Sequence, residues 1–118
     1  MLKDKALENL AAGESLLAAG HVNAATTRLY YAMYQAAVHR LTLKGHRPGT
    51  IRSGAVDWDH SMVENNVFMC RRDRRDRPLY AVMRRLRGQA DYDDGSVERC
   101  RLDERREAIR DFVEELTR

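Results

Sequence analysis

A stretch of sixteen residues, 23–38, contains neither glycine nor proline and is rich in alanine. Because alanine favours the helix most and glycine and proline favour it least, the stretch predicts a long helix. Ala32 and Ala36 fall on one face of that helix, and Tyr30 and Tyr34 fall on the adjoining face. Small side chains let another helix approach closely, whereas tyrosines fill the next groove and need partners for their hydroxyl groups. The stretch therefore predicts the central helix of a small bundle, with a polar feature inside it.

Glycines delimit two long helices in the first part of the chain. We expect helices over residues 3–19 and 22–44, joined at Gly20. Gly45 suits the left-handed conformation that often follows a last helical turn. Residues 45–57 are rich in glycine and proline, which predicts a loop, and a loop of this length is usually functional or mobile.

Capping residues and a proline mark the later helices. A third helix is expected to start near Asp57 or Asp59, whose carboxylates can accept hydrogen bonds from the first turn. Pro78 suits the first turn of a fourth helix, and Ser96 is expected to cap a last one. No alternation typical of strands is seen. We therefore predict a single all-α domain over residues 1–118, an up-and-down bundle of four long helices plus a fifth element.

The composition argues against several classes of protein. Apolar residues make up 43% of the chain and charged residues 33%, which is typical of a globular domain. No apolar run approaches the ~20 residues of a membrane span, and Asp4 and Glu8 interrupt any signal-peptide pattern. Cys70 and Cys100 lack metal-binding spacing and are interpreted as free thiols. We expect a cytoplasmic protein without a metal, a cofactor or a membrane partner.

Charge is distributed unevenly along the second half of the chain. Residues 71–88 contain eight arginines and two aspartates, whereas residues 89–118 contain ten acidic residues and six arginines. Such asymmetry either attracts an anionic partner to one end or lets the two segments face each other within the bundle. For the arginine run at residues 71–77 we favour a solvated connection, partly paired with the acidic last third, over a phosphate site.

Two motifs together resemble a known family. The central stretch reads Asn-Ala-Ala-Thr-Thr-Arg-Leu-Tyr-Tyr-Ala-Met-Tyr over residues 23–34, and Arg-Gly-Gln-Ala-Asp-Tyr follows at residues 87–92. This combination is similar to the HEPN-domain proteins (higher eukaryotes and prokaryotes nucleotide-binding), especially their small stand-alone branch, over nearly the whole chain. The resemblance implies a HEPN-like bundle and a homodimer. It also implies a minimal nucleotidyltransferase partner in a toxin–antitoxin-like system, with nucleotide or RNA binding or a regulatory role as the function.

The second motif bears on activity. Ribonuclease members of the family place a histidine a few residues after the arginine and act on RNA without a metal ion. Here Arg87 is present, but Asp91 and Tyr92 stand where the histidine is wanted. A carboxylate repels phosphate, and a tyrosine of pKa ~10 is a poor base at neutral pH. We therefore favour a structural or ligand-ordering role for these three residues. The alternative is a metal-independent ribonuclease toxin that uses Arg87 and His60, the latter matching a family histidine.

Arg28 and Tyr31 on the central helix are further candidates for ligand binding or regulation. Arg28 is a permanent charge on a mostly apolar helix, so we expect it to be buried and paired with Asp91 or Tyr92. In relatives that work with a nucleotidyltransferase, a tyrosine beside the second motif is adenylylated by the partner. That resemblance implies Tyr92 as the acceptor, ahead of Tyr31 and the other tyrosines of the central helix, which are expected to be buried.

A third hypothesis is a purely structural dimeric interaction protein. The alanine- and tyrosine-rich helix is apolar on more faces than the short helices of its own bundle are expected to cover. A second copy of the chain would cover the remainder. The homodimer is therefore expected under all three hypotheses.

Overall fold

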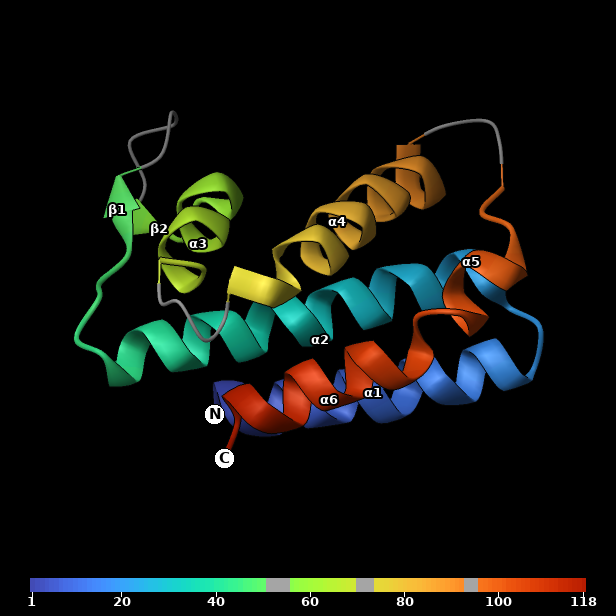
Figure 1. Cartoon of the computed structure of the whole chain (residues 1–118), viewed down its shortest axis with the longest axis horizontal. Helices are drawn as coiled ribbons and strands as arrows, with labels where there is room; N and C mark the ends of the chain where they lie inside the picture. Colours follow the sequence, from blue (N-terminus) through green and yellow to red (C-terminus); the bar gives the residue numbers. More distant parts are fainter. Residues whose placement is uncertain (51–55, 70–73, 93–95) are drawn as a thin grey trace.

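The computed structural model describes residues 1–50, 56–69, 74–92 and 96–118. The described part of the chain is almost entirely helical, which confirms the all-α prediction (Figure 1). A two-residue antiparallel pairing, which was not predicted, joins the strands β1 and β2. The elements are α1 (Leu2–Ala18), α2 (Val22–Leu43), β1 (Gly49–Thr50), β2 (Val56–Asp57), α3 (His60–Val67), the 3-10 turn η1 (Arg74–Asp76), α4 (Arg77–Tyr92), α5 (Arg99–Asp103) and α6 (Arg106–Leu116).

The first two helices form a hairpin whose bounds lie within a residue of the predicted ones. Gly20 and Gly45 both adopt positive φ angles, 87° and 88°, so each turn or helix end uses a conformation that glycine tolerates best. Gly13 is buried where α1 crosses α2, and a Cβ atom there would lie 2.7 Å from Leu29 Cδ2. The absence of a side chain at Gly13 therefore permits the close packing of the hairpin.

Helix α2 is the centre of the fold. Figure 1 shows α2 between α1 and α6 on one side and α3 and α4 on the other, and α2 contacts all four. Ala32, Ala36, Ala37 and Tyr30 of α2 have no exposed surface in the single chain. The premise that the bundle leaves these apolar faces uncovered is therefore wrong. The homodimer remains a prediction, but uncovered apolar faces on α2 no longer support it.

The starts of α3 and α4 follow the predicted signals. The Asp59 carboxylate accepts hydrogen bonds from the backbone N–H groups of Ser61 at 2.8 Å and Met62 at 3.2 Å, which confirms Asp59 as the N-cap of α3. The other candidate cap, Asp57, has a side chain outside the described part of the structure. Pro78 lies in the first turn of α4, as predicted.

The last predicted helix is divided into two. Helix α5 ends at Asp103 and α6 begins at Arg106, and between the buried residues Leu102 and Ile109 the sequence offers only charged residues and one alanine. A continuous helix there has nothing to bury, so the chain turns instead. The cap prediction for Ser96 was wrong, because the N-cap of α5 is Glu98.

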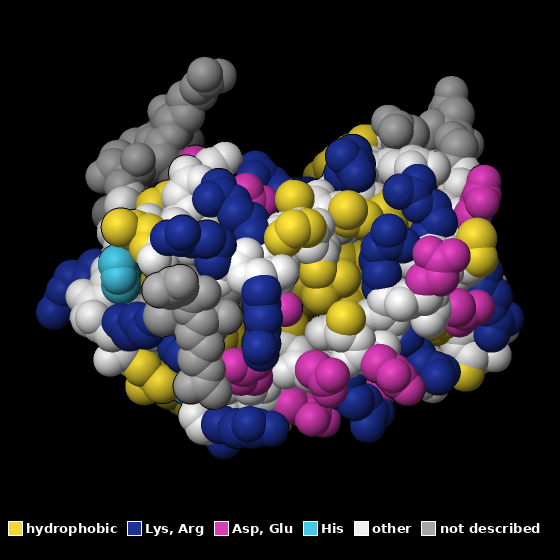
Figure 2. All heavy atoms as spheres, in the orientation of Figure 1, with side chains coloured by type: hydrophobic (Ala, Val, Ile, Leu, Met, Phe, Trp, Pro, Cys, Tyr) yellow, Lys and Arg dark blue, Asp and Glu magenta, His cyan; other side chains and the backbone are white. Residues whose placement is uncertain are grey.

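One face of the molecule combines apolar and basic surface. Figure 2 shows hydrophobic side chains exposed between α3 and α4, flanked by Lys and Arg side chains, with acidic side chains gathered below over α6. Among the described residues, no helix is both long enough and apolar enough to cross a bilayer. The region between α3 and α4 is also where the predicted site residues of α2, α3 and α4 meet.

Candidate functional site

Arg87 of α4 lies over the tyrosines of α2. Its Nη2 atom donates a 2.7 Å hydrogen bond to the hydroxyl of Tyr31. The guanidinium carbon lies 5.2 Å from the ring centre of Tyr31, 5.8 Å from that of Tyr30 and 5.4 Å from that of Tyr92. These distances are within the range of cation–π attraction. With only 20% of its side chain exposed, Arg87 is a largely desolvated positive charge against aromatic faces.

Asp91 pairs with Arg87 along α4 and with Thr27 across to α2. The Nε atom of Arg87 lies 3.0 Å from Asp91 Oδ2, but it does not direct its hydrogen at that oxygen, so this buried atom makes no hydrogen bond among the described residues. Thr27 Oγ1 donates a 2.5 Å hydrogen bond to the other carboxylate oxygen, Oδ1. Burial lowers the pKa of Arg87, but Tyr31, Tyr92 and Asp91 outweigh it and raise the pKa, so the guanidinium stays charged.

His60 belongs to the same cluster of side chains as Arg87. It begins α3, and its Nδ1 atom lies 2.6 Å from the hydroxyl of Tyr30. Its ring stacks on Tyr34 with centres 4.2 Å apart and planes 14° apart. Tyr31 lies edge-on to His60 at 6.2 Å between ring centres, so Tyr31 contacts both His60 and Arg87. The three tyrosines of α2, Tyr30, Tyr31 and Tyr34, are called the tyrosine cluster below.

Beneath His60, two tyrosine hydroxyls lie deep in the core. Tyr30 and Tyr80 have no exposed surface, and burial raises the pKa of both phenols. The Tyr80 hydroxyl lies near that of Tyr30 but makes no hydrogen bond of good geometry with any described residue. Neutral Tyr30 donates to Nδ1 of His60 when the imidazole carries its proton on Nε2 alone, and accepts from Nδ1 when that nitrogen carries a proton.

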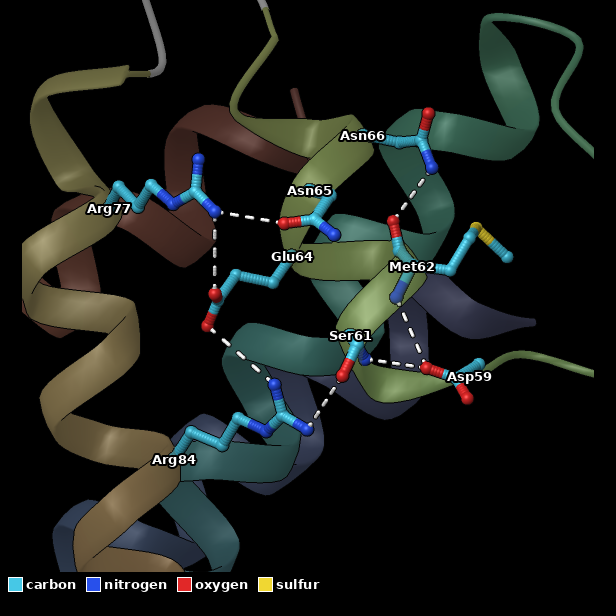
Figure 3. Close-up of polar contacts among 8 residues, drawn as sticks. All are labelled: Asp59, Ser61, Met62, Glu64, Asn65, Asn66, Arg77 and Arg84. Atoms are coloured by element: carbon cyan, nitrogen blue, oxygen red, sulfur yellow. Dashed lines mark hydrogen bonds and ion pairs between the residues drawn. The ribbon is translucent and has the colours of Figure 1, made fainter.

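A polar bridge fixes α3 against α4 (Figure 3). Glu64 lies between two arginines of α4, with 3.7 Å to Arg77 Nη2 and 4.0 Å to Arg84 Nη1. Arg77 also donates to Asn65 Oδ1 at 2.9 Å, and Arg84 donates to Ser61 Oγ at 3.1 Å. Because Ser61 directly follows His60, this bridge sets the position of the imidazole relative to Arg87.

The structure brings most of the predicted site residues together. Arg87, Tyr31, Asp91 and Tyr92 are in direct contact, and His60 joins them through the tyrosine cluster. Tyr92 is 74% exposed, whereas Tyr31 and Tyr34 are only half-buried rather than fully buried as expected. Cys70 and residues 71–73 and 93–95 lie outside the described part of the chain.

Arg28 is not part of this site. It is exposed and its Nη1 atom donates a 3.0 Å hydrogen bond to Asn9 Oδ1 on α1. The prediction of a buried charge paired with Asp91 or Tyr92 was therefore wrong. The reason is the register of α2, which turns residue 28 towards the edge of α1 and turns Thr27 towards α4.

Thr27 was missed as a site residue, although a signal was present. It precedes Tyr31 by four residues, so the two side chains share one face of α2. Arg87 and Asp91 have the same spacing on α4. Helical spacing alone pairs Thr27 with Tyr31, but only the packing of α2 on α4 brings Thr27 to Asp91.

Among the described residues of the arginine run, one pairs with the acidic last third, as expected, and another pairs with α3 instead. Arg75 forms an ion pair with Glu115 of α6 at 3.4 Å, and Arg77 pairs with Glu64. Within the described ranges, no group of three or more His, Cys, Asp and Glu residues is placed to hold a metal ion. Cys100 is an exposed free thiol.

The class of protein that the fold and site define is an all-α protein with a half-buried arginine held over tyrosine rings. Comparison of the chain with protein-family models, curated proteins and solved structures finds no match. The resemblance to HEPN proteins thus rests on the two sequence motifs and remains a prediction.

Proposed function

We propose that this protein is a HEPN-like, up-and-down helical bundle that binds nucleotide or RNA and acts with a minimal nucleotidyltransferase partner in a toxin–antitoxin-like system. The observation that supports this most is the state of Arg87. It is a permanent charge, largely removed from water, whose Nη1 atom makes no hydrogen bond among the described residues. A guanidinium prepared in this way is suited to a phosphate group.

The surroundings of Arg87 suit the rest of a nucleotide. Tyr92 is exposed and its ring lies beside the guanidinium, so a base can stack on it while the phosphate contacts Arg87. Lys and Arg side chains flank the apolar surface in Figure 2. The combination of stacking surface and positive charge is typical of proteins that bind single-stranded nucleic acid without reading its sequence.

Ribonuclease activity is the second candidate, because His60 lies in the same cluster of side chains as Arg87. Binding is the better supported function. The Nδ1 atom of His60 is engaged by Tyr30, and Asp91 is engaged by both Thr27 and Arg87. The contacts of Asp91 occupy both of its carboxylate oxygens, whereas a hydrogen bond at one ring nitrogen of a histidine also occurs where the other nitrogen transfers a proton.

Tyr92 is the acceptor we propose for a modifying partner. Its hydroxyl would attack the α-phosphate of ATP, lose its proton, and release pyrophosphate as the leaving group. Tyr92 is 74% exposed and Tyr30 is not exposed at all, so access favours Tyr92. The AMP adduct would add bulk and one negative charge beside Arg87, which would block the phosphate site. Mass spectrometry after co-expression with a minimal nucleotidyltransferase tests this, and an adduct only on another residue would reject it.

Fluorescence anisotropy with a labelled short single-stranded RNA tests the binding function. We expect an affinity that falls with salt, and a loss of about tenfold in Arg87→Gln, because a phosphate contact is removed. Arg85→Gln on the same helix is the matched control and should change the affinity less than about twofold. If neither RNA nor AMP binds in a salt-dependent way, the purely structural hypothesis is left.

A cleavage assay tests the ribonuclease alternative. RNA cleavage in EDTA that His60→Ala abolishes would establish the ribonuclease instead.

A further inference from the structure

We infer that Thr27 and Asp91 are positioning residues, which hold Arg87 in the orientation that leaves one edge of its guanidinium open to an anionic ligand. This inference deepens the proposed function and rests on it. The sequence motif includes Asp91 but not Thr27, and neither residue is assigned to ligand contact here.

The geometry is a closed ring of four residues on two helices, which we call the four-residue ring. Thr27 donates to Asp91 Oδ1 at 2.5 Å, Asp91 Oδ2 lies 3.0 Å from Arg87 Nε, and Arg87 Nη2 donates to the Tyr31 hydroxyl at 2.7 Å. One turn of α2 joins Tyr31 back to Thr27, and one turn of α4 joins Arg87 to Asp91. Arg87 and Asp91 are therefore each held by a neighbour on their own helix and one on the other, whereas Thr27 and Tyr31 contact the set only across the helix interface.

Thr27 is suited to its role by its single hydroxyl proton and its branched side chain. The oxygen also lies 3.4 Å from the carbonyl of Asn23 within α2, but the contact to Asp91 is much shorter and is assisted by charge. A β-branched residue in a helix has few side-chain conformations, so the hydroxyl is presented to Asp91 in advance.

The consequence for Asp91 is that its carboxylate is held away from the usual bidentate arrangement with arginine. Oδ2 is near Nε, but Nε does not point its hydrogen at it. Without the Thr27 hydroxyl, the carboxylate is free to turn and accept from both Nε and Nη2, which draws Arg87 off Tyr31. A guanidinium neutralised in this way is a poorer partner for a phosphate.

Thr27→Val tests this inference because valine keeps the shape of threonine and removes only the hydroxyl. In a proton–nitrogen NMR spectrum, the Arg87 Nε–Hε signal is assigned by its loss in Arg87→Lys. We expect this proton signal to move downfield in Thr27→Val, as a hydrogen bond to Asp91 forms, and to stay in place in Thr27→Ser. Thr42→Val is the matched control, because the Thr42 hydroxyl donates within α2, to the carbonyl of Val38, and to no other described residue.

The affinity for the same labelled RNA provides the second measurement. We expect Thr27→Val to weaken binding by about three- to tenfold, with Thr27→Ser restoring it and Thr42→Val without effect. An Arg87 signal that is identical in Thr27→Val and wild type would overturn the inference, even if RNA binding stands. If wild-type protein binds no RNA, the proposed function fails, and the NMR signal still decides whether Thr27 positions Arg87.

Discussion

At the scale of single residues, Tyr80 is the most unusual side chain in the core. It has no exposed surface, it packs edge-on against Tyr30 and Phe68, and its hydroxyl lacks a hydrogen bond among the described residues. A buried hydroxyl without a partner loses its hydration and gains nothing in return. Tyr30 differs, because its hydroxyl is bonded to His60. We therefore expect the loss of the hydroxyl group to change the free energy of unfolding in opposite directions at these two tyrosines.

Tyr80→Phe should raise the free energy of unfolding by about 1 kcal/mol, because it removes an unsatisfied buried polar group and keeps the ring. Tyr30→Phe should lower it by about 1 kcal/mol, because it breaks the hydrogen bond to His60. Chemical denaturation of both variants measures these changes. A clear loss of stability in Tyr80→Phe would show that its hydroxyl has a partner in solution.

The two buried tyrosines also determine how the free energy of unfolding depends on pH in the alkaline range. Burial raises the pKa of Tyr80 and Tyr30 in the folded protein above the unfolded value of about 10. Above that pH the unfolded chain releases these protons and the folded protein retains them. The contribution of the two buried tyrosines to the free energy of unfolding is therefore fully present below about pH 10. It is lost as the pH rises further, by up to ~1.4 kcal/mol per pH unit for each tyrosine. Unfolding measured at a series of alkaline pH values should show a shallower loss in Tyr80→Phe, and equal slopes would contradict this.

At the scale of elements, the α1–α2 hairpin depends on the close contact between Gly13 and Leu29. The core contains Leu29 with no exposed surface, so this side chain has little freedom to give way. Gly88 of α4 provides the contrast, since a Cβ atom there would meet nothing within 4 Å. The two helical glycines have the same backbone cost and differ only in the space around them.

Gly13→Ala should therefore destabilise the protein by about 1–3 kcal/mol, despite the better helix propensity of alanine, because the new methyl group overpacks the core. Gly88→Ala should stabilise it by about 0.5–1 kcal/mol through propensity alone. Thermal or chemical unfolding of the pair provides the test. Stabilisation by both substitutions would mean that α1 and α2 are able to separate slightly at no cost.

How well the elements follow from the sequence depends on whether their cause is local. Gly20, Gly45 and the Asp59 cap act within one turn of chain, and the helix ends they predict are confirmed. The charged stretch that divides α5 from α6 is also visible in the sequence, but the exposure of Arg28 depends on which faces of α2 the neighbouring helices cover. Packing of that kind is not encoded in any short window of sequence.

The candidate site divides in the same way. The i,i+4 pair of Arg87 and Asp91 is visible in the sequence, and the resemblance to a known family indicates Tyr92 and His60. The contact between Thr27 and Asp91 joins residues that are 64 positions apart. Only the arrangement of α2 against α4 places these two side chains at hydrogen-bonding distance.

At the scale of the whole molecule, ion pairs connect the last helix to the others. Arg110 of α6 forms a bidentate pair with Glu14 of α1, in which Nε donates to Oε2 at 3.2 Å and Nη2 donates to Oε1 at 2.8 Å. Arg75 reaches Glu115 of α6, and Arg40 of α2 donates to the carbonyl oxygen of the same residue at 3.2 Å. In the Arg75–Glu115 pair an acidic residue of the last third holds a basic residue of another element, whereas in the Arg110–Glu14 pair the basic residue belongs to α6.

A homodimer remains our prediction for the assembled molecule, although the faces of α2 first expected to form it are covered by the chain itself. The hydrophobic surface exposed between α3 and α4 in Figure 2 is the remaining structural reason to expect it. Light scattering at micromolar concentration should give about twice the mass of the 13.6 kDa chain. A monomer at that concentration would reject the dimer.

Asp91 and Tyr92 occupy the last turn of α4, at the negative end of the helix dipole. Any further negative charge attached at Tyr92 would meet that field as well as the Asp91 carboxylate, at a cost of roughly 0.3–1 kcal/mol, and it would also draw the Arg87 guanidinium away from Asp91. The last turn would then fray, and amide hydrogen exchange at its final residues would accelerate. Because Asp91 lies in that turn, such fraying would open the four-residue ring from the end of the helix, one turn away from the arginine it holds.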